Sequence, residues 1–294
     1  MPVSAYGCRP AATAALLWLT FVGHALAADA ASLVPPELRA SEQIRFGTSP
    51  TYAPLEFKDP ASNALSGLDI DLGDGIAKRL GLQPVWIEQG FEQLIPSLET
   101  RRIDVGASGM TDIPARRGKT DFVDYFATGV QLFTFAPAPV GITVPTDLCG
   151  KAVAVNRNGI FLIRTREFSE THCVAAGHPA IELVPTDKTA DSRLQMMPGR
   201  ADAAAQGVDS IRYLNESQNS ADRGKFALIG NPISIDHAGF GIAKSRPALR
   251  DAVTAGVKEM IADGSYAAIF RKWEMPYTQV QTVTINGDET EPAK

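Results

Sequence analysis

The stretch "FEQLIPSLETRRIDVGASGMT", Phe91 to Thr111, predicts an amphipathic helix followed directly by a short strand. Leu94, Ile95 and Leu98 recur at the spacing that places apolar side chains on one helix face. "IDVGAS" then has the apolar and small residues of a buried strand, and it ends in a loop that contains glycine and hydroxyl side chains. The stretch therefore predicts one helix–strand step of an α/β fold.

The residues before this stretch continue the alternation. "QIRFGTS" predicts a strand, "LDIDLGDGIAKRLG" a helix and "PVWIEQ" a second strand. Within the helix, Leu72, Ile76 and Leu80 lie one turn apart, and Gly81 is a typical stop. Strands that alternate with helices in this way indicate a parallel sheet flanked by helices.

A second unit of the same kind follows the proline-dotted segment "FAPAPVGITVPTDL". The strands "KAVAVN", "AIELVP" and "ADAAAQ" alternate with the helices "GIFLIRTREFSETHC" and "DKTADSRLQMM", and "GNPISIDHAGFGIA" then crosses back to two further helices. "RIDVGASG" and "RADAAAQG" occupy the third-strand position of their units, either as an internal echo or by coincidence. If the echo holds, two similar lobes face each other with strand ends that open into glycine-containing loops, and ligands bind beyond such ends.

The start of the chain predicts export. Arg9 precedes the apolar run "AATAALLWLTFVGHALA", which ends in an A-x-A site and predicts a signal peptide over 1–27, cleaved after Ala27. The alternative, a transmembrane anchor, is disfavoured because Thr and His interrupt a run shorter than the roughly 20 residues of a span. Cleavage removes one basic and no acidic residue, so a net charge of −5 becomes −6. An acidic chain argues against nucleic acid as a partner.

The number of cysteines fits an exported protein in an oxidising compartment. Cys8 leaves with the signal peptide, and Cys149 and Cys173 remain. An even pair in an exported protein indicates one disulfide, with two buried thiols as the alternative. No spacing of Cys and His supports a zinc site, and we expect no metal and no cofactor.

The polar residues indicate binding rather than catalysis. No nucleophile motif or glycine-rich phosphate loop is present, and the histidines lack an evident serine or carboxylate partner. Tyr52, Phe91 and the segment Ser108–Arg116 each follow a different predicted strand, so they can converge at one sheet edge. There the two rings would sandwich an apolar or cationic group, although core packing is the alternative for either ring alone. Arg116 would take a carboxylate beside the backbone N–H groups of Gly109 and Thr111, and Arg117 would be a surface charge.

The motifs "IRFGTSPTYAPLEF", "GLDIDLGDGIAKRLG", "FEQLIPSLETRRIDVGASGMT", "DLCGKAVAV", "GRADAAAQ" and "ADGSYAAIFRKW" resemble the extracytoplasmic solute-binding proteins, family 3, of polar amino acid ABC transporters. They occur in the family's order over essentially the whole mature chain. The resemblance implies a type II periplasmic-binding-protein fold: two α/β lobes, each a mainly parallel sheet flanked by helices, joined by two crossover strands. It places lobe 1 at 43–134 plus 238–275, lobe 2 at 136–233 and a flexible tail at 277–294.

The resemblance also implies a ligand site between the lobes. Tyr52 and Phe91 would form the sandwich, and Arg116 would bind the α-carboxylate of the ligand. The remaining contacts would come from the side chains and backbone of Ser108, Gly109, Thr111, Gly159, Ile160 and Asp209.

This chain departs from the family pattern at three positions. Ile113 stands where the family often has a second Thr, and Asn158-Gly159-Ile160 replaces a loop that usually carries two hydroxyls. Gly207 stands where an Asp usually holds the ligand ammonium group. Either Asp209 reaches into the site in its place, the ligand is not a free α-amino acid, or the alignment slips by two residues.

The implied function is the periplasmic component of an ABC importer: a monomer that binds a small carboxylate-bearing solute, an amino acid or a derivative, and delivers it to an inner-membrane permease. Two alternatives stay open. One is a periplasmic enzyme similar to cyclohexadienyl dehydratase, with Glu92 and Asp209 as the acid or base. The other is an accessory protein of a quinoprotein dehydrogenase.

Overall fold

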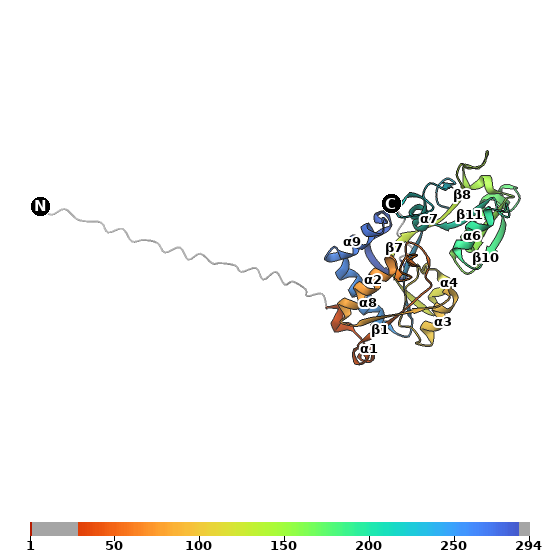
Figure 1. The fold of residues 1–294 in the computed structure, drawn as a ribbon. Coiled ribbons are helices and arrows are strands. Elements are labelled where there is room, and N and C mark those ends of the chain that lie inside the picture. Colours follow the sequence, from red (N-terminus) through yellow and green to blue (C-terminus); the bar gives the residue numbers. More distant parts are fainter. Residues whose placement is uncertain (2–28, 288–294) are drawn as a thin grey trace.

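The computed structural model describes Met1 and residues 29–287. Two α/β lobes lie side by side, and the long strand β7 runs from the first toward the second (Figure 1). The signal peptide expected over 1–27, with Cys8 and the cleavage site, lies outside the described residues except for Met1. Over residues 29–287, no helix is long and apolar enough to cross a bilayer.

A six-stranded mixed sheet forms the first lobe, in the order β14-β7-β13-β6-β1-β5. Its parallel strands are β1 (Gln43–Thr48), β5 (Gln83–Glu88) and β6 (Val105–Gly106), and its antiparallel strands are β13 (Asp236–Ala243), β7 (Thr120–Thr128) and β14 (Gln279–Ile285). Its helices are α1 (Pro36–Ser41), α2 (Leu68–Leu80), α3 (Leu94–Glu99), α4 (Pro114–Arg117), α8 (Pro247–Ala262) and α9 (Ser265–Lys272). The small sheet β2 (Thr51–Tyr52), β3 (Glu56–Lys58) and β4 (Leu65–Ser66) follows β1.

The α2 helix shows why the sequence folds as it does. Leu72, Ile76 and Leu80 are buried in the core of this lobe, as their helical spacing predicts. Gly81 ends the helix with φ +67°, a left-handed conformation that glycine adopts at little cost. Gly47 and Gly73 lie so close to Ile103 and Trp86 that a side chain at either position would force these neighbours to move.

A five-stranded mixed sheet forms the second lobe, in the order β10-β9-β11-β8-β12. Its parallel strands are β9 (Ala152–Asn156), β10 (Glu182–Thr186) and β11 (Ala203–Gly207), and its antiparallel strands are β8 (Val130–Phe135) and β12 (Phe226–Leu228). Its helices are α5 (Ile160–Phe168), α6 (Thr189–Met196) and α7 (Val208–Glu216). Cys149 and Cys173 form the expected disulfide, with Cα atoms 5.5 Å apart.

The two lobes share a strand order. In each lobe the first strand of the unit lies between the second and the third, as β5-β1-β6 and β10-β9-β11. The segments "RIDVGASG" and "RADAAAQG" contain β6 and β11, so the echo in the sequence falls on equivalent strands.

Three expectations about the fold need correction. The sheets are mixed rather than mainly parallel, because β7, β8 and β13 join them antiparallel. The segment 43–134, expected in lobe 1, includes most of β8, which pairs in the second sheet. The tail expected to be flexible from 277 forms strand β14, which pairs with β7 and buries Val283 in the core; residues 288–294 lie outside the described part.

Candidate ligand-binding site

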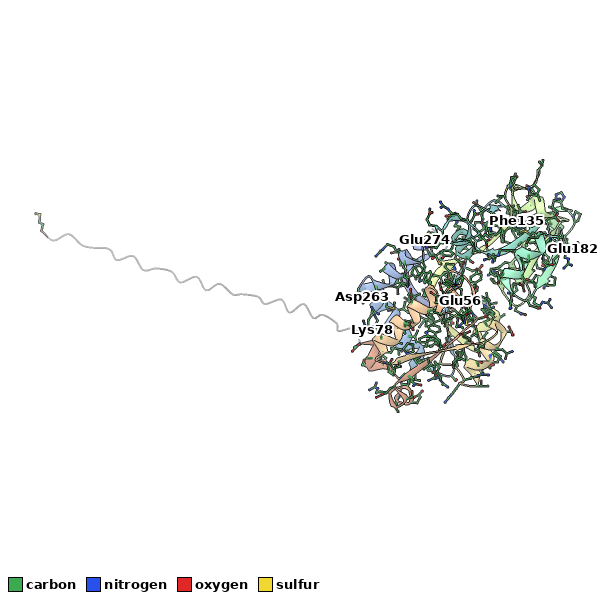
Figure 2. The ribbon with its side chains drawn as sticks, viewed as in Figure 1. Glu56, Lys78, Phe135, Glu182, Asp263 and Glu274 are labelled. Atoms are coloured by element: carbon green, nitrogen blue, oxygen red, sulfur yellow. A yellow bond between two sulfur atoms is a disulfide. The ribbon has the colours of Figure 1, made fainter. Side chains whose placement is uncertain are left out.

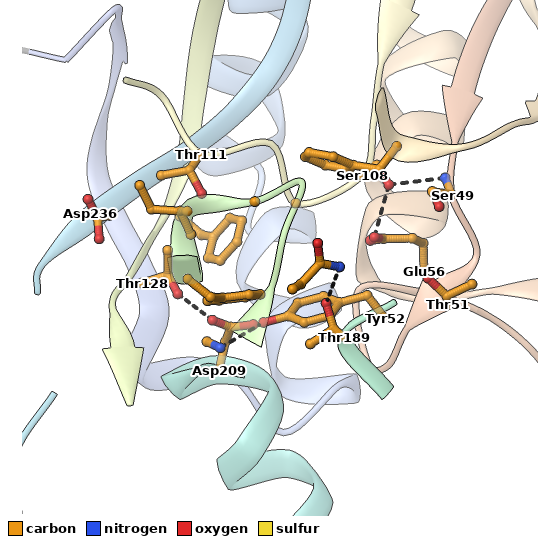
Figure 3. A pocket seen from close by; sticks show the side chains of 18 of the residues that line it. Ser49, Thr51, Tyr52, Glu56, Ser108, Thr111, Thr128, Thr189, Asp209 and Asp236 are labelled. Carbon is orange, nitrogen blue, oxygen red and sulfur yellow. Dashed lines mark hydrogen bonds between the residues drawn. The ribbon is translucent and has the colours of Figure 1, made fainter. Parts of the chain in front are cut away.

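A cavity lies between the lobes, where the carboxyl ends of their parallel strands meet (Figure 3). Residues that follow β1, β5 and β6 line it from the first lobe, and residues that follow β9, β10 and β11 line it from the second. All nine residues that the sequence proposed as ligand contacts line this cavity: Tyr52, Phe91, Ser108, Gly109, Thr111, Arg116, Gly159, Ile160 and Asp209. Their contact with a ligand stays a prediction.

Arg116 brings a positive charge to the cavity without a carboxylate partner. Its Nη1 donates to the carbonyl oxygen of Thr111 at 2.8 Å, and its guanidinium lies over the Phe91 ring, 5.3 Å from the centroid. Among residues 29–287 it forms no ion pair. Burial lowers the pKa of Arg116 to about 10, with the nearby Asp112 opposing the shift, so the guanidinium is still charged at neutral pH. The remaining N–H groups can therefore take an anion.

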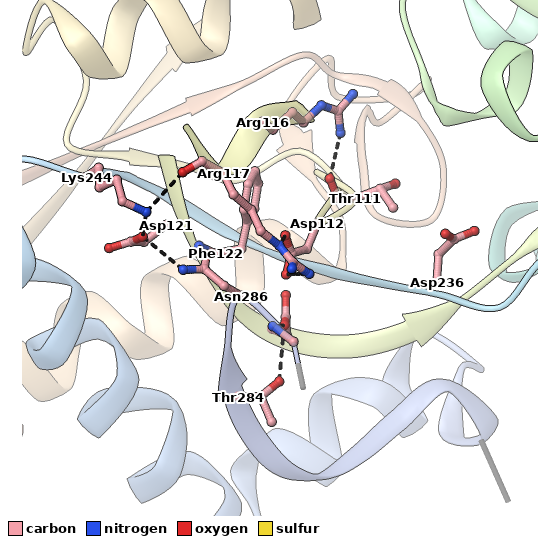
Figure 4. A network of polar contacts seen from close by, with 12 residues as sticks. Thr111, Asp112, Arg116, Arg117, Asp121, Phe122, Asp236, Lys244, Thr284 and Asn286 are labelled. Carbon is pink, nitrogen blue, oxygen red and sulfur yellow. Dashed lines mark hydrogen bonds and ion pairs between the residues drawn. The ribbon is translucent and has the colours of Figure 1, made fainter. Parts of the chain in front are cut away.

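Arg117 has a different role from the one expected of a surface charge. Its Nε and Nη2 donate to the two carboxylate oxygens of Asp112 at 2.7 and 3.1 Å (Figure 4). The Asp112 side chain is only 1% exposed, so this bidentate pair neutralises a buried charge. The neighbouring arginines thus differ: Arg117 stabilises the fold by pairing with Asp112, and Arg116 lines the cavity.

The aromatic rings contact other partners than the predicted sandwich suggests. The Tyr52 ring stacks on Phe161 from the second lobe, with centroids 6.2 Å apart and an angle of 29° between the planes. Phe91 packs under Arg116 instead. The sequence did not single out Phe161, although it follows the proposed contact Ile160 directly.

Ser108 and Gly109 are already satisfied within the protein. Ser108 Oγ accepts from the Ser49 N–H at 3.0 Å and donates to Glu56 Oε1 at 3.0 Å. The Gly109 N–H donates to Asp69 Oδ2 at 2.8 Å. The expectation that this N–H lies free beside Arg116 is therefore wrong, because a buried carboxylate occupies it.

The position of Gly207 explains the missing aspartate. A Cβ atom there would lie 2.3 Å from Tyr52 Oη and 2.5 Å from Asp209 Oδ1, so the space of a side chain is already filled. The Gly207 N–H donates to Tyr52 Oη at 3.1 Å across the lobes. Asp209, two residues further on in α7, brings its carboxylate to the same place.

Asp209 has one free oxygen. The Thr128 hydroxyl donates to Oδ1 (Figure 3), whereas Oδ2 is buried and accepts no hydrogen bond from any described residue. Burial raises the pKa of Asp209, while the hydrogen bonds from Thr128 and Tyr52 act against that shift. A buried acceptor without a hydrogen bond raises the free energy of the protein, so a bound molecule that donates to this oxygen would be stabilised.

The amino end of α5 supplies further donors. Gly159 precedes the nine-residue helix, and its first N–H groups have no acceptor within the helix. Positive partial charge at this end favours an anion. In the described part of the chain, no cluster of three or more His, Cys, Asp or Glu side chains is placed to hold a metal ion.

Comparison with known proteins agrees with this arrangement. The family model for bacterial extracellular solute-binding proteins, family 3, matches residues 44–276. An arginine-binding protein of Corynebacterium glutamicum is 27% identical over 255 residues, 87% of this chain and 82% of the relative. The histidine-binding periplasmic protein of Salmonella typhimurium is 32% identical over 240 residues, 79% of this chain and 87% of the relative.

Solved structures with this architecture include relatives that bind amino acids. A mutant of the arginine-binding protein from T. maritima superposes with a TM-score of 0.70 at 27% identity, covering 83% of this chain and 99% of that one. An ancestral amino acid-binding protein, described as a precursor of cyclohexadienyl dehydratase, also gives 0.70, at 26% identity, covering 81% of this chain and 97% of that one. Two lobes with matching strand orders, a cavity at their strand ends and a family model that spans both lobes agree: the chain belongs to the bacterial extracellular solute-binding proteins, family 3.

Proposed function

We propose that this protein binds a free α-amino acid between its lobes and delivers it to an inner-membrane ABC permease. The observation that carries the proposal is a pair of opposite charges at one cavity, neither of which forms an ion pair among residues 29–287. Within the described part of the chain, Arg116 on the first lobe has only a carbonyl oxygen as acceptor, and Asp209 Oδ2 on the second lobe has no donor. A zwitterion offers a carboxylate to the first and an ammonium group to the second.

In this proposal the carboxylate lies between Arg116 and the amino end of α5. The ammonium group contacts Asp209, which takes the place of the aspartate that Gly207 lacks. The side chain of the bound amino acid extends along the rings of Tyr52, Phe91 or Phe161. We further propose that the protein is a periplasmic monomer whose signal peptide is cleaved after Ala27, as the sequence and its periplasmic relatives suggest.

Calorimetry with a panel of amino acids tests the proposal. L-Arginine and L-histidine, named in the descriptions of relatives, come first. Each is compared with its α-carboxamide and its Nα-acetyl derivative, which lack one of the two charges. Loss of a charge-assisted hydrogen bond costs about 1.5–3 kcal/mol, so each derivative should bind about 10- to 150-fold more weakly. A carboxamide that binds as tightly as its parent would exclude the Arg116 clamp.

Variants separate the two charges. Arg116→Met keeps an unbranched apolar stem but removes the guanidinium and its charge, and Asp209→Asn removes the negative charge. Arg116→Met should weaken binding of the parent amino acid more than binding of its α-carboxamide. Asp209→Asn should weaken binding of the parent more than binding of its Nα-acetyl derivative. Arg102→Met, at an exposed position, is the control and should bind as the wild type does.

Catalysis is a second candidate, because Asp209 is a buried carboxyl in the cavity whose pKa is raised by burial, as a general acid requires. The other candidate acid, Glu92, is exposed and does not line the cavity. Incubation with prephenate and arogenate tests this alternative. Turnover that Asp209→Asn abolishes would establish an enzyme, and binding without turnover would favour transport.

A further inference from the structure

A buried carboxyl group lies beneath the ligand-binding loop formed by residues Ser108–Thr111. Glu56 is 2% exposed, and its Oε1 accepts the hydrogen bond from Ser108 Oγ. Its Oε2 receives no N–H or O–H donor from any described residue. The side chain lies where the two lobes meet (Figure 2) and lines the cavity. An ionised carboxylate with one open oxygen would be costly here, so its protonation state needs an account.

A second buried carboxyl group explains the protonation state of Glu56. Asp69 in α2 is fully buried and accepts hydrogen bonds from the Gly109 N–H and from the Tyr125 hydroxyl. Geometry places the carboxyl of Glu56 next to it: the Asp69 N–H donates to the carbonyl oxygen of Leu55 at 2.9 Å, and the two acids hold the consecutive residues Ser108 and Gly109. Two carboxyl groups can share a hydrogen bond only if one of them carries a proton. Because two donors already stabilise the anionic form of Asp69, the proton resides on Glu56.

We propose that Glu56 and Asp69 hold one proton between them, and that this acid pair positions the loop Ser108–Thr111 for ligand binding. Glu56 anchors the Ser108 side chain, and Asp69 anchors the Gly109 backbone. The loop then continues to Thr111, whose carbonyl oxygen orients Arg116. Both acids are thus positioning residues for the carboxylate-binding arginine. The loop's role in binding rests on the proposed function, whereas the shared proton does not.

The surroundings of the pair determine how it responds to pH. Burial raises the pKa of Glu56 well above its ordinary value, and the negative charges of Asp69 and Asp209 raise it further. Burial also raises the pKa of Tyr52 and of Tyr125, which therefore stay protonated. Loss of the shared proton would leave two carboxylates in contact in the protein interior, and like charges this close repel strongly. The anchors of the loop would then weaken, and ligand affinity would fall as the pH rises.

Glu56→Gln is a matched test because the amide keeps both hydrogen bonds. Its N–H can donate to Asp69 and its carbonyl oxygen can accept from Ser108, but it has no proton to lose in this range. The dissociation constant of L-arginine is measured by calorimetry from about pH 5 to about pH 10 for wild type, Glu56→Gln and the exposed control Glu182→Gln. Titration of L-arginine itself affects all three proteins alike. We expect the affinity of wild type and of the control to fall at least about tenfold more than that of Glu56→Gln. Identical profiles for wild type and Glu56→Gln would overturn the proposal.

Hydrogen exchange of the Gly109 amide tests the pair without any ligand. Corrected for the intrinsic rate, its protection should fall with rising pH in the wild type and stay level in Glu56→Gln. A purely structural role for Glu56 would predict the same trend in both proteins and would refute the shared proton. If L-arginine binds to no variant while exchange behaves as expected, arginine is not the ligand and the acid pair stands. If L-arginine binds but the protection of the Gly109 amide does not fall with pH in the wild type, the shared proton is refuted and the proposed binding function is retained.

Discussion

Gly207→Ala should weaken ligand binding although it adds a single methyl group. The new Cβ would lie 2.3 Å from Tyr52 Oη and 2.5 Å from Asp209 Oδ1, closer than a Cβ atom approaches a neighbouring atom in real structures. Neither atom can move freely. Tyr52 is stacked on Phe161 and accepts the Gly207 N–H, and Asp209 is held by the Thr128 hydroxyl. One lobe or one of these side chains must therefore shift.

The magnitude follows from the cost of overpacking, about 1–3 kcal/mol for one inserted methyl group. The clash with Tyr52 acts across the lobes, so most of this cost should fall on the arrangement in which the two lobes contact each other, rather than on the folding of either lobe. At 1.4 kcal/mol per factor of ten, the dissociation constant should rise about 5- to 150-fold. The free energy of unfolding without ligand should change much less.

Calorimetry with the amino acid identified by the panel measures the effect, and urea unfolding monitors the stability of each variant. Gly118→Ala is the control, because nothing lies within 4 Å of its added Cβ. Adding Tyr52→Phe to Gly207→Ala removes the closer of the two clashing atoms and should recover part of the loss. Equal affinities for Gly207→Ala and wild type would show that the contact between Tyr52 and Gly207 is absent from the liganded form, and the argument for why this position is glycine would fail.

Two further predictions concern stability. The disulfide between Cys149 and Cys173 spans 24 residues, so replacing both with serine should lower the free energy of unfolding by about 3–4 kcal/mol in urea titrations, and reductant should have no effect on that variant. Burial alone would raise the pKa of Asp104, but the ion pairs with Arg45 and Arg246 hold it below its ordinary value of 3.8. The carboxylate therefore contributes stability above that value that is lost as the pH falls through the lowered pKa, and Asp104→Asn should flatten the acid limb of a stability–pH profile while costing about 3 kcal/mol at neutral pH.

Local patterns predicted the parts of the fold that depend on local chemistry. The apolar spacing and Gly81 predicted α2. The polar loops that directly follow predicted strands indicated which residues line the cavity. Strand pairing was predicted less well, because antiparallel partners such as β14 depend on contacts between distant segments. The polar tail that suggested fraying contains Val283, which the core of the first lobe buries.

The site was predicted at the level of residues but not of their partners. The spacing after β6 identified Ser108 and Gly109, yet nothing local indicated that Glu56 and Asp69 already satisfy them. In the same way, the sequence left open whether Asp209 could replace an aspartate at position 207. That answer depends on Tyr52 from the other lobe, which fills the space beside Gly207. Contacts between lobes have no signature in a single sequence.

The charges of the site come from opposite lobes, and this division relates ligand recognition to closure. Arg116 belongs to α4 of the first lobe, and Asp209 belongs to α7 of the second. A solute with only one of the complementary charges can satisfy one lobe and leaves the other charge buried without a partner, at a cost that disfavours the closed form. A ligand shifts a conformational equilibrium only by its difference in affinity between the two states, and only a molecule that bridges both groups has a large difference here. If the site binds a zwitterion as proposed, selectivity and closure of the lobes over the ligand follow from the same two charges, and a variant that removes either charge should reduce both together.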